Sequence, residues 1–263
     1  MNGAWCRWAT LLTCLGAVLV ACRPPEGSPA GFVDRIGVVL LSEAPSGKVS
    51  GQATFTRLEA PRAAAQVAAP LGAQVGSCRV TGDVDPSAGP IAPGATGNRL
   101  NAGNATFRAG GTDYASLSRT DSGHYQFAGA TEPLPATLSF DLAVSGAFPS
   151  FTDLSVATGT ALRLADTVDP DAITTETEFA WDPGEAGSAV ILIGSGGGTA
   201  FSCLADDATG TFAFPEATRQ ELAAAGFAGG KLDVVGRITS TQATSGSSLL
   251  MINALRLTDP RNE

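Results

Sequence analysis

Histidine is nearly absent from this sequence of 263 residues, in which His124 is the only one. Zinc and copper sites usually combine several histidine or cysteine ligands, so the sequence predicts no such centre. It also lacks the Gly-Lys-Ser/Thr end of a phosphate-binding loop and the Gly-x-Ser-x-Gly turn of many hydrolases. We therefore expect no metal, nucleotide or other cofactor.

Long apolar runs are equally scarce, and the one that exists stands at the beginning of the chain. No charged residue occurs between Trp8 and Cys22, and Arg7 precedes this run. A helix that crosses a bilayer needs about 20 apolar residues, so this run is too short and has the form of an export signal.

The apolar run ends in Leu19-Val20-Ala21-Cys22, which resembles the lipobox of bacterial lipoproteins. In such signals the cysteine thiol receives diacylglycerol, and the peptidase needs a small residue before the cut, which Ala21 supplies. We therefore predict cleavage between Ala21 and Cys22 and lipidation of Cys22. An ordinary secretory signal that happens to contain a cysteine is the alternative.

The predicted signal peptide covers residues 1–21, and residues 22–31 form the lipidated cysteine with a flexible tether rich in proline and glycine. Arg23 follows the cysteine, whereas the lipobox pattern uses aspartate there to mark inner-membrane retention. We expect a cell-envelope protein that is anchored facing away from the cytoplasm, in the outer membrane if the cell has one.

Basic residues are few, because 16 Lys and Arg stand against 25 Asp and Glu, a formal net charge of -9. Loss of residues 1–21 removes only Arg7 from this balance (16 minus 1, against 25) and gives -10. Such a charge predicts repulsion from nucleic acid and from anionic lipid. Membrane lipid is then held through acylated Cys22, where each buried methylene contributes about 0.8 kcal/mol. An envelope protein or polysaccharide is a further expected partner.

Only two cysteines, Cys78 and Cys203, follow Cys22 in the sequence. An even pair in an exported protein more often forms a disulfide than two free thiols. We predict that bridge, which would tie together the two halves of the chain.

Apolar and polar residues alternate at residues 49–55, 138–144 and 232–238, the period of half-buried strands. Residues 190–193 are continuously apolar, which favours a central strand covered on both faces. Residues 215–225 favour one short helix, because Pro215 can begin it and Gly226 can end it.

The many short strands predict an all-β protein, an antiparallel β-sandwich. We expect two Ig-like sandwich domains, residues 32–165 and 166–258, with one short crossover helix and a tail at 259–263. A single fused sandwich is the alternative. Residues 59–69 are alanine-rich and fit a helix or a loop equally well.

Two segments could carry catalysis or nucleotide binding. Asp121, Ser122 and His124 contain the residue types of a hydrolase triad, but triad members normally converge from separate parts of a fold, so we favour a turn before a strand. Residues 194–198 are glycine-rich and follow an apolar strand, yet a strand-like segment comes next. Without a helix N-terminus to hold phosphate, a hairpin loop is the better interpretation.

Acidic residues form three clusters in the sequence, and calcium could use their carboxylate oxygens as ligands. None of the three clusters has the ligand spacing of an EF-hand, so solvated turns are the better interpretation. The aromatic residues could line a groove but more simply belong to the core. The clusters are Asp83 and Asp85; Asp166, Asp169 and Asp171; Asp206 and Asp207; the aromatics are Tyr114, Tyr125, Phe148, Phe151, Phe179 and Trp181.

Several short motifs together resemble a group of uncharacterised bacterial envelope lipoproteins. The resemblance implies an anchored β-sandwich and carries no catalytic residues with it. The motifs are Gly76-Ser77-Cys78-Arg79-Val80, Leu100-Asn101-Ala102-Gly103, Gly146-Ala147-Phe148-Pro149, Phe179-Ala180-Trp181-Asp182-Pro183, Phe201-Ser202-Cys203 and Gly210-Thr211-Phe212-Ala213-Phe214-Pro215.

The function that these features favour is that of a non-enzymatic, membrane-anchored envelope lipoprotein, which binds a ligand or partner or has a structural role at the cell surface. An exported hydrolase acting on polysaccharide or peptide is one alternative. A calcium-dependent adhesion module is the other.

Overall fold

The computed structural model describes residues 31–63, 75–82, 97–130, 132–143, 147–184 and 187–261. The predicted signal peptide, the cleavage site at Ala21 and Cys22, the tether before Gly31, and Asp83 and Asp85 lie outside these ranges. Within the described ranges, no helix is long and apolar enough to span a membrane.

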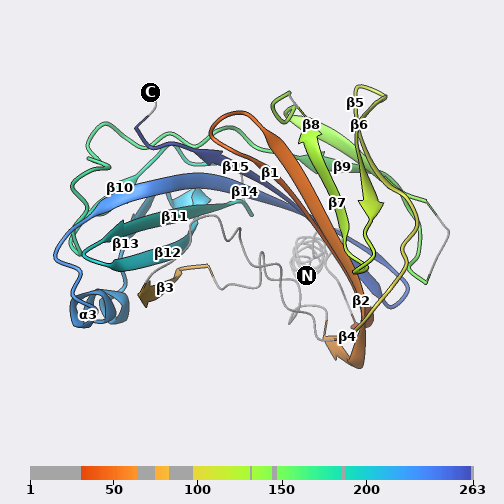
Figure 1. Ribbon diagram of the computed structural model, residues 1–263, viewed down its shortest axis with the longest axis horizontal. Coiled ribbons are helices and arrows are strands. Elements are labelled where there is room, and N and C mark those ends of the chain that lie inside the picture. The colour runs from red at the N-terminus through yellow and green to blue at the C-terminus, as the bar shows by residue number, and fades with distance from the viewer. Residues whose placement is uncertain are drawn as a thin grey trace, which may run out of the picture.

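Thirteen strands form one large mixed sheet that bends into a crescent (Figure 1). Its order is β3-β12-β11-β14-β15-β1-β2-β7-β6-β5-β8-β9, and β4 pairs separately with β2. The strands are β1 (Phe32–Glu43), β2 (Val49–Ala63), β3 (Ser77–Gly82), β4 (Gly97–Arg99), β5 (Ala105–Ala109), β6 (Thr112–Arg119), β7 (Tyr125–Ala130), β8 (Thr137–Leu142), β9 (Phe151–Ala157), β11 (Ala189–Gly196), β12 (Thr199–Asp206), β14 (Lys231–Ser245) and β15 (Ser248–Thr258).

A separate two-stranded sheet, one 3-10 turn and one short α-helix complete the described part of the chain. Strands β10 (Glu178–Ala180) and β13 (Thr211–Ala213) pair with each other. The short 3-10 turn η2 (Asp207–Thr209) follows β12, and the helix α3 (Glu216–Ala224) follows β13.

The chain is rich in β-strand as predicted, but the sheet is mixed and the two Ig-like sandwiches are not clearly present. Strand β1 pairs in parallel with β15, from Arg35 opposite Ser248 to Glu43 opposite Arg256. A strand of the first half and a strand of the second half are therefore neighbours in the middle of one sheet. The prediction of a purely antiparallel arrangement is wrong at this pair, because alternation identifies a strand without specifying its partner.

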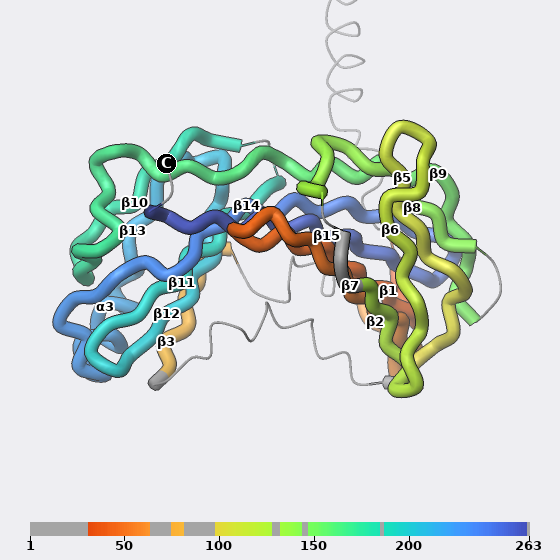
Figure 2. Tube along the Cα trace, turned by 45° about the horizontal axis from the view of Figure 1, so that its top comes forward, coloured from red at the N-terminus to blue at the C-terminus, as the bar shows by residue number. Residues whose placement is uncertain are grey.

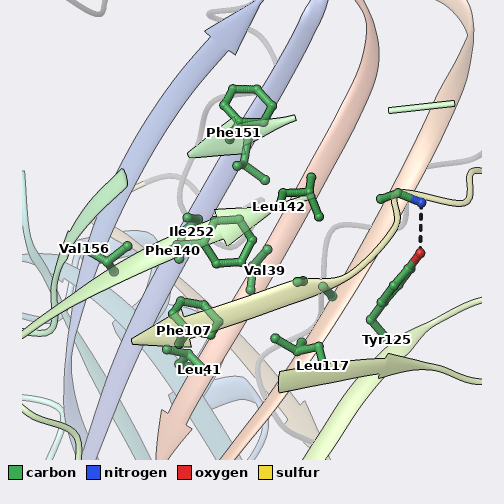
Figure 3. Close-up of a cluster of buried hydrophobic side chains, with 14 of the residues drawn as sticks. Val39, Leu41, Phe107, Leu117, Tyr125, Phe140, Leu142, Phe151, Val156 and Ile252 are labelled. Carbon is green, nitrogen blue, oxygen red and sulfur yellow. Dashed lines mark hydrogen bonds between the residues drawn. The ribbon is translucent and has the colours of Figure 1, made fainter. Parts of the chain in front are cut away.

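At one end, the sheet curls over itself and encloses the first core. Strands β5, β8 and β9 carry Phe107, Phe140 and Phe151 toward Val39 on β1 and Ile252 on β15 (Figure 3). The aromatic rings of Phe107 and Phe140 lie 4.8 Å apart, centroid to centroid. This end, which we call the first lobe, draws nearly all its buried residues from positions 39–156.

At the other end, a second lobe lies on the same side of the sheet. Its core joins Val190 and Leu192 of β11 to Phe179 of β10 and Leu222 of α3. Figure 2 shows the two lobes at opposite ends, with β1, β14 and β15 crossing the middle. Long strands thus connect two cores that are filled by different parts of the chain.

The predictions of individual helices and strands agree with the structure better than the prediction of two sandwich domains does. Helix α3 occupies the predicted 215–225 region, and Pro215 precedes it. Residues 190–193 form a central strand, β11, with Val190 and Leu192 in the second lobe and Ile191 buried on the opposite face. Strand β2 continues to Ala63, so the first residues of the alanine-rich stretch 59–69 are strand rather than helix.

Candidate functional site

A hollow lies in the second lobe, at the turn between β11 and β12. It has a volume of about 840 Å³ and is walled by residues 171–174, 195–200 and 229–231. Three stretches of chain far apart in sequence therefore meet at this end of the sheet, at the left of Figure 1.

The glycines of this hollow are required by backbone packing. A Cβ at Gly196 would overlap the carbonyl oxygen of Gly229, and one at Gly230 would overlap that of Ser195. Gly197 and Gly198 both have positive φ, at 62° and 82°, as a two-residue hairpin turn requires. The sequence prediction of a hairpin loop at 194–198 is confirmed by the antiparallel pairing of β11 with β12.

One polar cluster borders the hollow. The hydroxyl of Ser195 donates to a carboxylate oxygen of Asp233 at 2.6 Å. Lys231 lies 3.2 Å from the other oxygen of Asp233, and its side chain is 54 % exposed. Asp171, at the rim, is paired with Arg261 at 2.9 Å, and this hydrogen bond holds the pKa of the guanidinium above its ordinary value. The hollow thus offers hydrogen bonds and mixed charge to a small polar molecule.

The arrangement does not form a nucleophile with a general base. Ser195 donates to a carboxylate, and the only histidine of the chain, His124, stands beside β7 in the first lobe. Activation of a serine normally needs a base that is itself oriented by a third group.

Ser122 and His124, the hydrolase candidates in the first lobe, also form hydrogen bonds with nearby threonines. The Nδ1 atom of His124 lies 3.0 Å from the hydroxyl of Thr54, and the Ser122 hydroxyl lies 2.9 Å from that of Thr120. The second contact belongs to the turn between β6 and β7, where Thr120 also receives a backbone hydrogen bond from Gly123, and the first joins this turn to β2. Ser122 and His124 therefore serve a turn that leads into a strand, as the sequence favoured.

The structure contains the disulfide between Cys78 and Cys203, 125 positions apart in the chain. The two cysteines face each other on the neighbouring strands β3 and β12. Cys203 is 1 % exposed and belongs to the second core. The bridge therefore fixes the edge strand β3 to the second lobe.

The two neighbouring aspartates at the end of β12 have different roles. The sequence pattern predicted a solvated turn for both, and the buried ion pair of Asp207 was not predicted. Asp206 is exposed and its carboxylate accepts from the backbone of Ala208, as in a solvated turn. Asp207 is fully buried and pairs with Arg237 at 2.6 Å. Its carboxylate also accepts hydrogen bonds from the indole of Trp181 at 3.0 Å and from Ser188 at 2.6 Å.

The alternation of inward-facing and outward-facing residues along β12 and β14 could have predicted the pair of Asp207 and Arg237. Phe201, Cys203 and Ala205 face the second core, so Asp207 continues the inward positions of β12. Arg237 follows Val235 on the same face of β14. Two opposite charges at inward positions predict a buried pair.

Two further acidic candidates, Asp169 and Asp171, act as a cap and as the partner of Arg261, respectively. Asp169 accepts from the backbone of Asp171. No group of three or more potential metal ligands occurs among the described residues. Predicted aromatic candidates are mostly core: Tyr125, Phe148, Phe151, Phe179 and Trp181 are all buried.

Tyr114 is the exception among the aromatics, because it is only partly buried. Its hydroxyl donates to the carbonyl of Glu132 at 2.9 Å. Burial, and then the nearby carboxylates of Glu43 and Glu132, raise the pKa of this phenol above its usual range. Tyr114 therefore packs against the first core, and its hydroxyl joins β6 to the segment before β8.

No known protein family matches this chain, and no curated protein is similar to it in sequence.

Proposed function

We propose that this protein is a membrane-anchored lipoprotein of the bacterial cell envelope, with a non-enzymatic role in binding a ligand or partner. The observation that carries the proposal is the segment Leu19-Val20-Ala21-Cys22 at the end of an uncharged apolar run. The disulfide between Cys78 and Cys203 supports an oxidising compartment, which an exported protein enters.

The β-rich body fits the role of a carrier of binding surfaces. Its buried carboxylate, Asp207, is ion-paired with Arg237, and the hollow beside Ser195 offers hydrogen bonds without a histidine beside the serine. These features favour binding over hydrolysis. The absence of a three-ligand acidic cluster among the described residues gives calcium-dependent adhesion no supporting site there.

We further propose that the two lobes are the two sandwich-like domains expected from the sequence, fused through shared strands. The first core ends at Val156, apart from residues contributed by β15, and the second begins at Leu162. The predicted boundary at residues 165 and 166 lies close to this division.

Labelling with a fatty-acid analogue in the producing bacterium tests the anchor. We expect the wild-type chain to incorporate label and to fractionate with membranes, because the Cys22 thiol is the attachment atom. Cys22→Ser removes that atom and is expected to abolish incorporation. Cys78→Ser, together with Cys203→Ser, is the matched control and should retain the label. Equal incorporation in wild type and Cys22→Ser would refute lipidation.

A further inference from the structure

Arginines gather at the end of the sheet where the fold begins. Arg35 on β1 lies opposite Arg57 on β2, and Arg62 lies opposite Val33. Arg99 on β4 lies opposite Thr56, next to Arg57. This end of the sheet, with β4 beside the end of β2, is at the lower right of Figure 1.

A fifth arginine reaches the same place from β6. A Cβ on Gly123 would lie 3.3 Å both from a terminal nitrogen of Arg119 and from the Cδ of Arg99. Arg99 also donates to the backbone carbonyl of Ser122. The side chains of Arg119 and Arg99 therefore flank one turn, between β6 and β7.

These arginines carry charge that their surroundings leave largely uncompensated. Arg57, Arg62, Arg99 and Arg119 are exposed, and none forms an ion pair with another described residue. Arg35 is paired with Asp34 at 3.8 Å. Three carboxylates, Asp34, Glu59 and Asp121, stand close to these arginines in the sequence, whereas Glu43 and Asp113 lie at the opposite ends of β1 and β6. The five arginines therefore exceed the acidic residues of this end by two. In a chain of net charge -9, this is a local reversal of sign.

An exposed aromatic side chain marks the same end. Phe32, the first residue of β1, is 72 % exposed, more than any other large apolar side chain of the described residues. It lies opposite Ala63, beside Arg62. Aromatic rings next to basic residues are typical of surfaces that rest in the headgroup region of a membrane.

The tether brings this end close to the lipid. Nine residues, 23–31, separate Cys22 from Phe32, and a fully extended chain advances at most about 3.6 Å per residue. Ten residue-to-residue steps lead from Cys22 to Phe32, so the beginning of β1 stays within roughly 36 Å of the acylated cysteine. Other ends of the molecule have no such restraint.

We propose that the arginine-rich end of the sheet, formed by Phe32 with Arg57, Arg62, Arg99 and Arg119, rests on anionic phospholipid headgroups of the membrane that holds the acyl chains. This inference rests on the proposed lipoprotein anchor. The overall negative charge acts against it only weakly, because charges farther away than about 8 Å are screened at physiological salt. The hollow beside Ser195 lies in the other lobe, near the beginning of β14, whereas the start of β1 lies beside Ser247, just after the end of β14.

Vesicle binding of the processed chain, residues 22–263 with Cys22→Ser, tests the surface without acyl chains. We expect it to sediment with vesicles of phosphatidylglycerol and phosphatidylcholine and not with phosphatidylcholine alone. Each basic side chain near an anionic surface contributes about fivefold to binding, so Arg57→Gln/Arg62→Gln/Arg119→Gln should bind on the order of 100-fold more weakly.

The matched control is Lys48→Gln/Arg79→Gln/Arg163→Gln, which removes the same charge from exposed positions elsewhere. It should bind like the parent chain. Equal loss in the two triple variants would overturn the proposal, since net charge alone would then explain binding. Competition by inorganic phosphate as effective as competition by vesicles would also overturn it, because the surface would be a site for a free anion.

A second measurement leaves the arginines intact in case their loss prevents folding. Trp181, buried in the second lobe, is the only tryptophan beyond residue 21. Phe32→Trp adds an exposed reporter, whose fluorescence should be quenched by brominated phosphatidylglycerol in a salt-sensitive way. Unquenched fluorescence would refute contact of this end with the membrane. Fatty-acid labelling reads the anchor separately, so a failure of lipidation and a failure of the arginine surface give different results.

Discussion

Single side chains connect the second lobe to the middle of the sheet. Arg237, on β14, reaches Asp207 at 2.6 Å, the hydroxyl of Thr160 at 2.6 Å and the carbonyl of Asp182 at 2.6 Å. The guanidinium thus binds three separate loops around one buried carboxylate. Burying two charges is unfavourable by itself, so this cluster specifies the arrangement of the loops more than it adds to stability.

Loss of one member of this pair should be strongly destabilising. We expect Asp207→Ala to lower the free energy of unfolding by about 3 to 5 kcal/mol, because Arg237 is left as an uncompensated buried charge. Urea unfolding followed by tryptophan fluorescence measures the change, since Trp181 donates to Asp207.

Asp206→Ala is the control for the Asp207 substitution. It removes the same group one residue earlier, where only an exposed cap is lost, and should cost about 1 kcal/mol. Similar losses in the two variants would contradict a special role for the buried pair.

The β11–β12 hairpin shows how elements depend on backbone contact. Its glycines permit Gly196 to approach Gly229, while residue 173 exchanges two backbone hydrogen bonds with Gly230, each of 2.8 Å. The end of the sheet, the segment before β10 and the segment after α3 are thereby held together. The walls of the hollow are a consequence of this packing.

Two alanine substitutions in this hairpin separate steric contact from backbone strain. Gly198 has a positive φ, but a Cβ there would meet no atom within 4 Å. We expect Gly198→Ala to cost about 1 to 2 kcal/mol from the left-handed backbone alone. Gly196→Ala should cost more, because the methyl group overlaps backbone that cannot move aside without breaking the hairpin. Thermal unfolding compares the two, and a larger loss for Gly198→Ala would contradict the packing argument.

At the scale of the whole molecule, the chain closes on itself through strands that are distant in sequence. Strand β1 lies between β2, its neighbour in sequence, and β15, near the end of the described chain. Side chains also meet across this seam: Arg256 on β15 pairs with Glu43 on β1 at 3.2 Å and contacts Thr158. Both lobes should therefore unfold together.

The disulfide should stabilise the pairing of the edge strand β3 with β12. Cross-linking positions 125 residues apart restricts the unfolded chain, which in the chain-entropy model is worth about 4 to 5 kcal/mol. Cys78→Ala/Cys203→Ala should lower the urea midpoint and increase amide exchange in β3, whose strand neighbour is β12. The wild-type protein under reducing conditions should behave like the double variant. An unchanged midpoint in both would show that strand pairing alone holds this edge.

Much of the local structure could be predicted, because it depends on neighbouring residues. Alternation located β2, β8 and β14, the apolar run located β11, and Pro215 with Gly226 bounded α3. The count of cysteines predicted the bridge between Cys78 and Cys203. The hollow could not be predicted, since its three walls are brought together only by strand order.

The scarcity of histidine, the apolar run near the N-terminus and the motif Leu19-Val20-Ala21-Cys22, which resembles a lipobox, are properties of the sequence by itself, because each depends on residue type and spacing alone. The tertiary structure decided three other matters: that β1 and β15 make one sheet, that Asp207 is buried while Asp206 is solvated, and that arginines far apart in sequence share one end. Each depends on which strands become neighbours. Pairing is settled by long-range burial, which a local pattern of apolar residues leaves open.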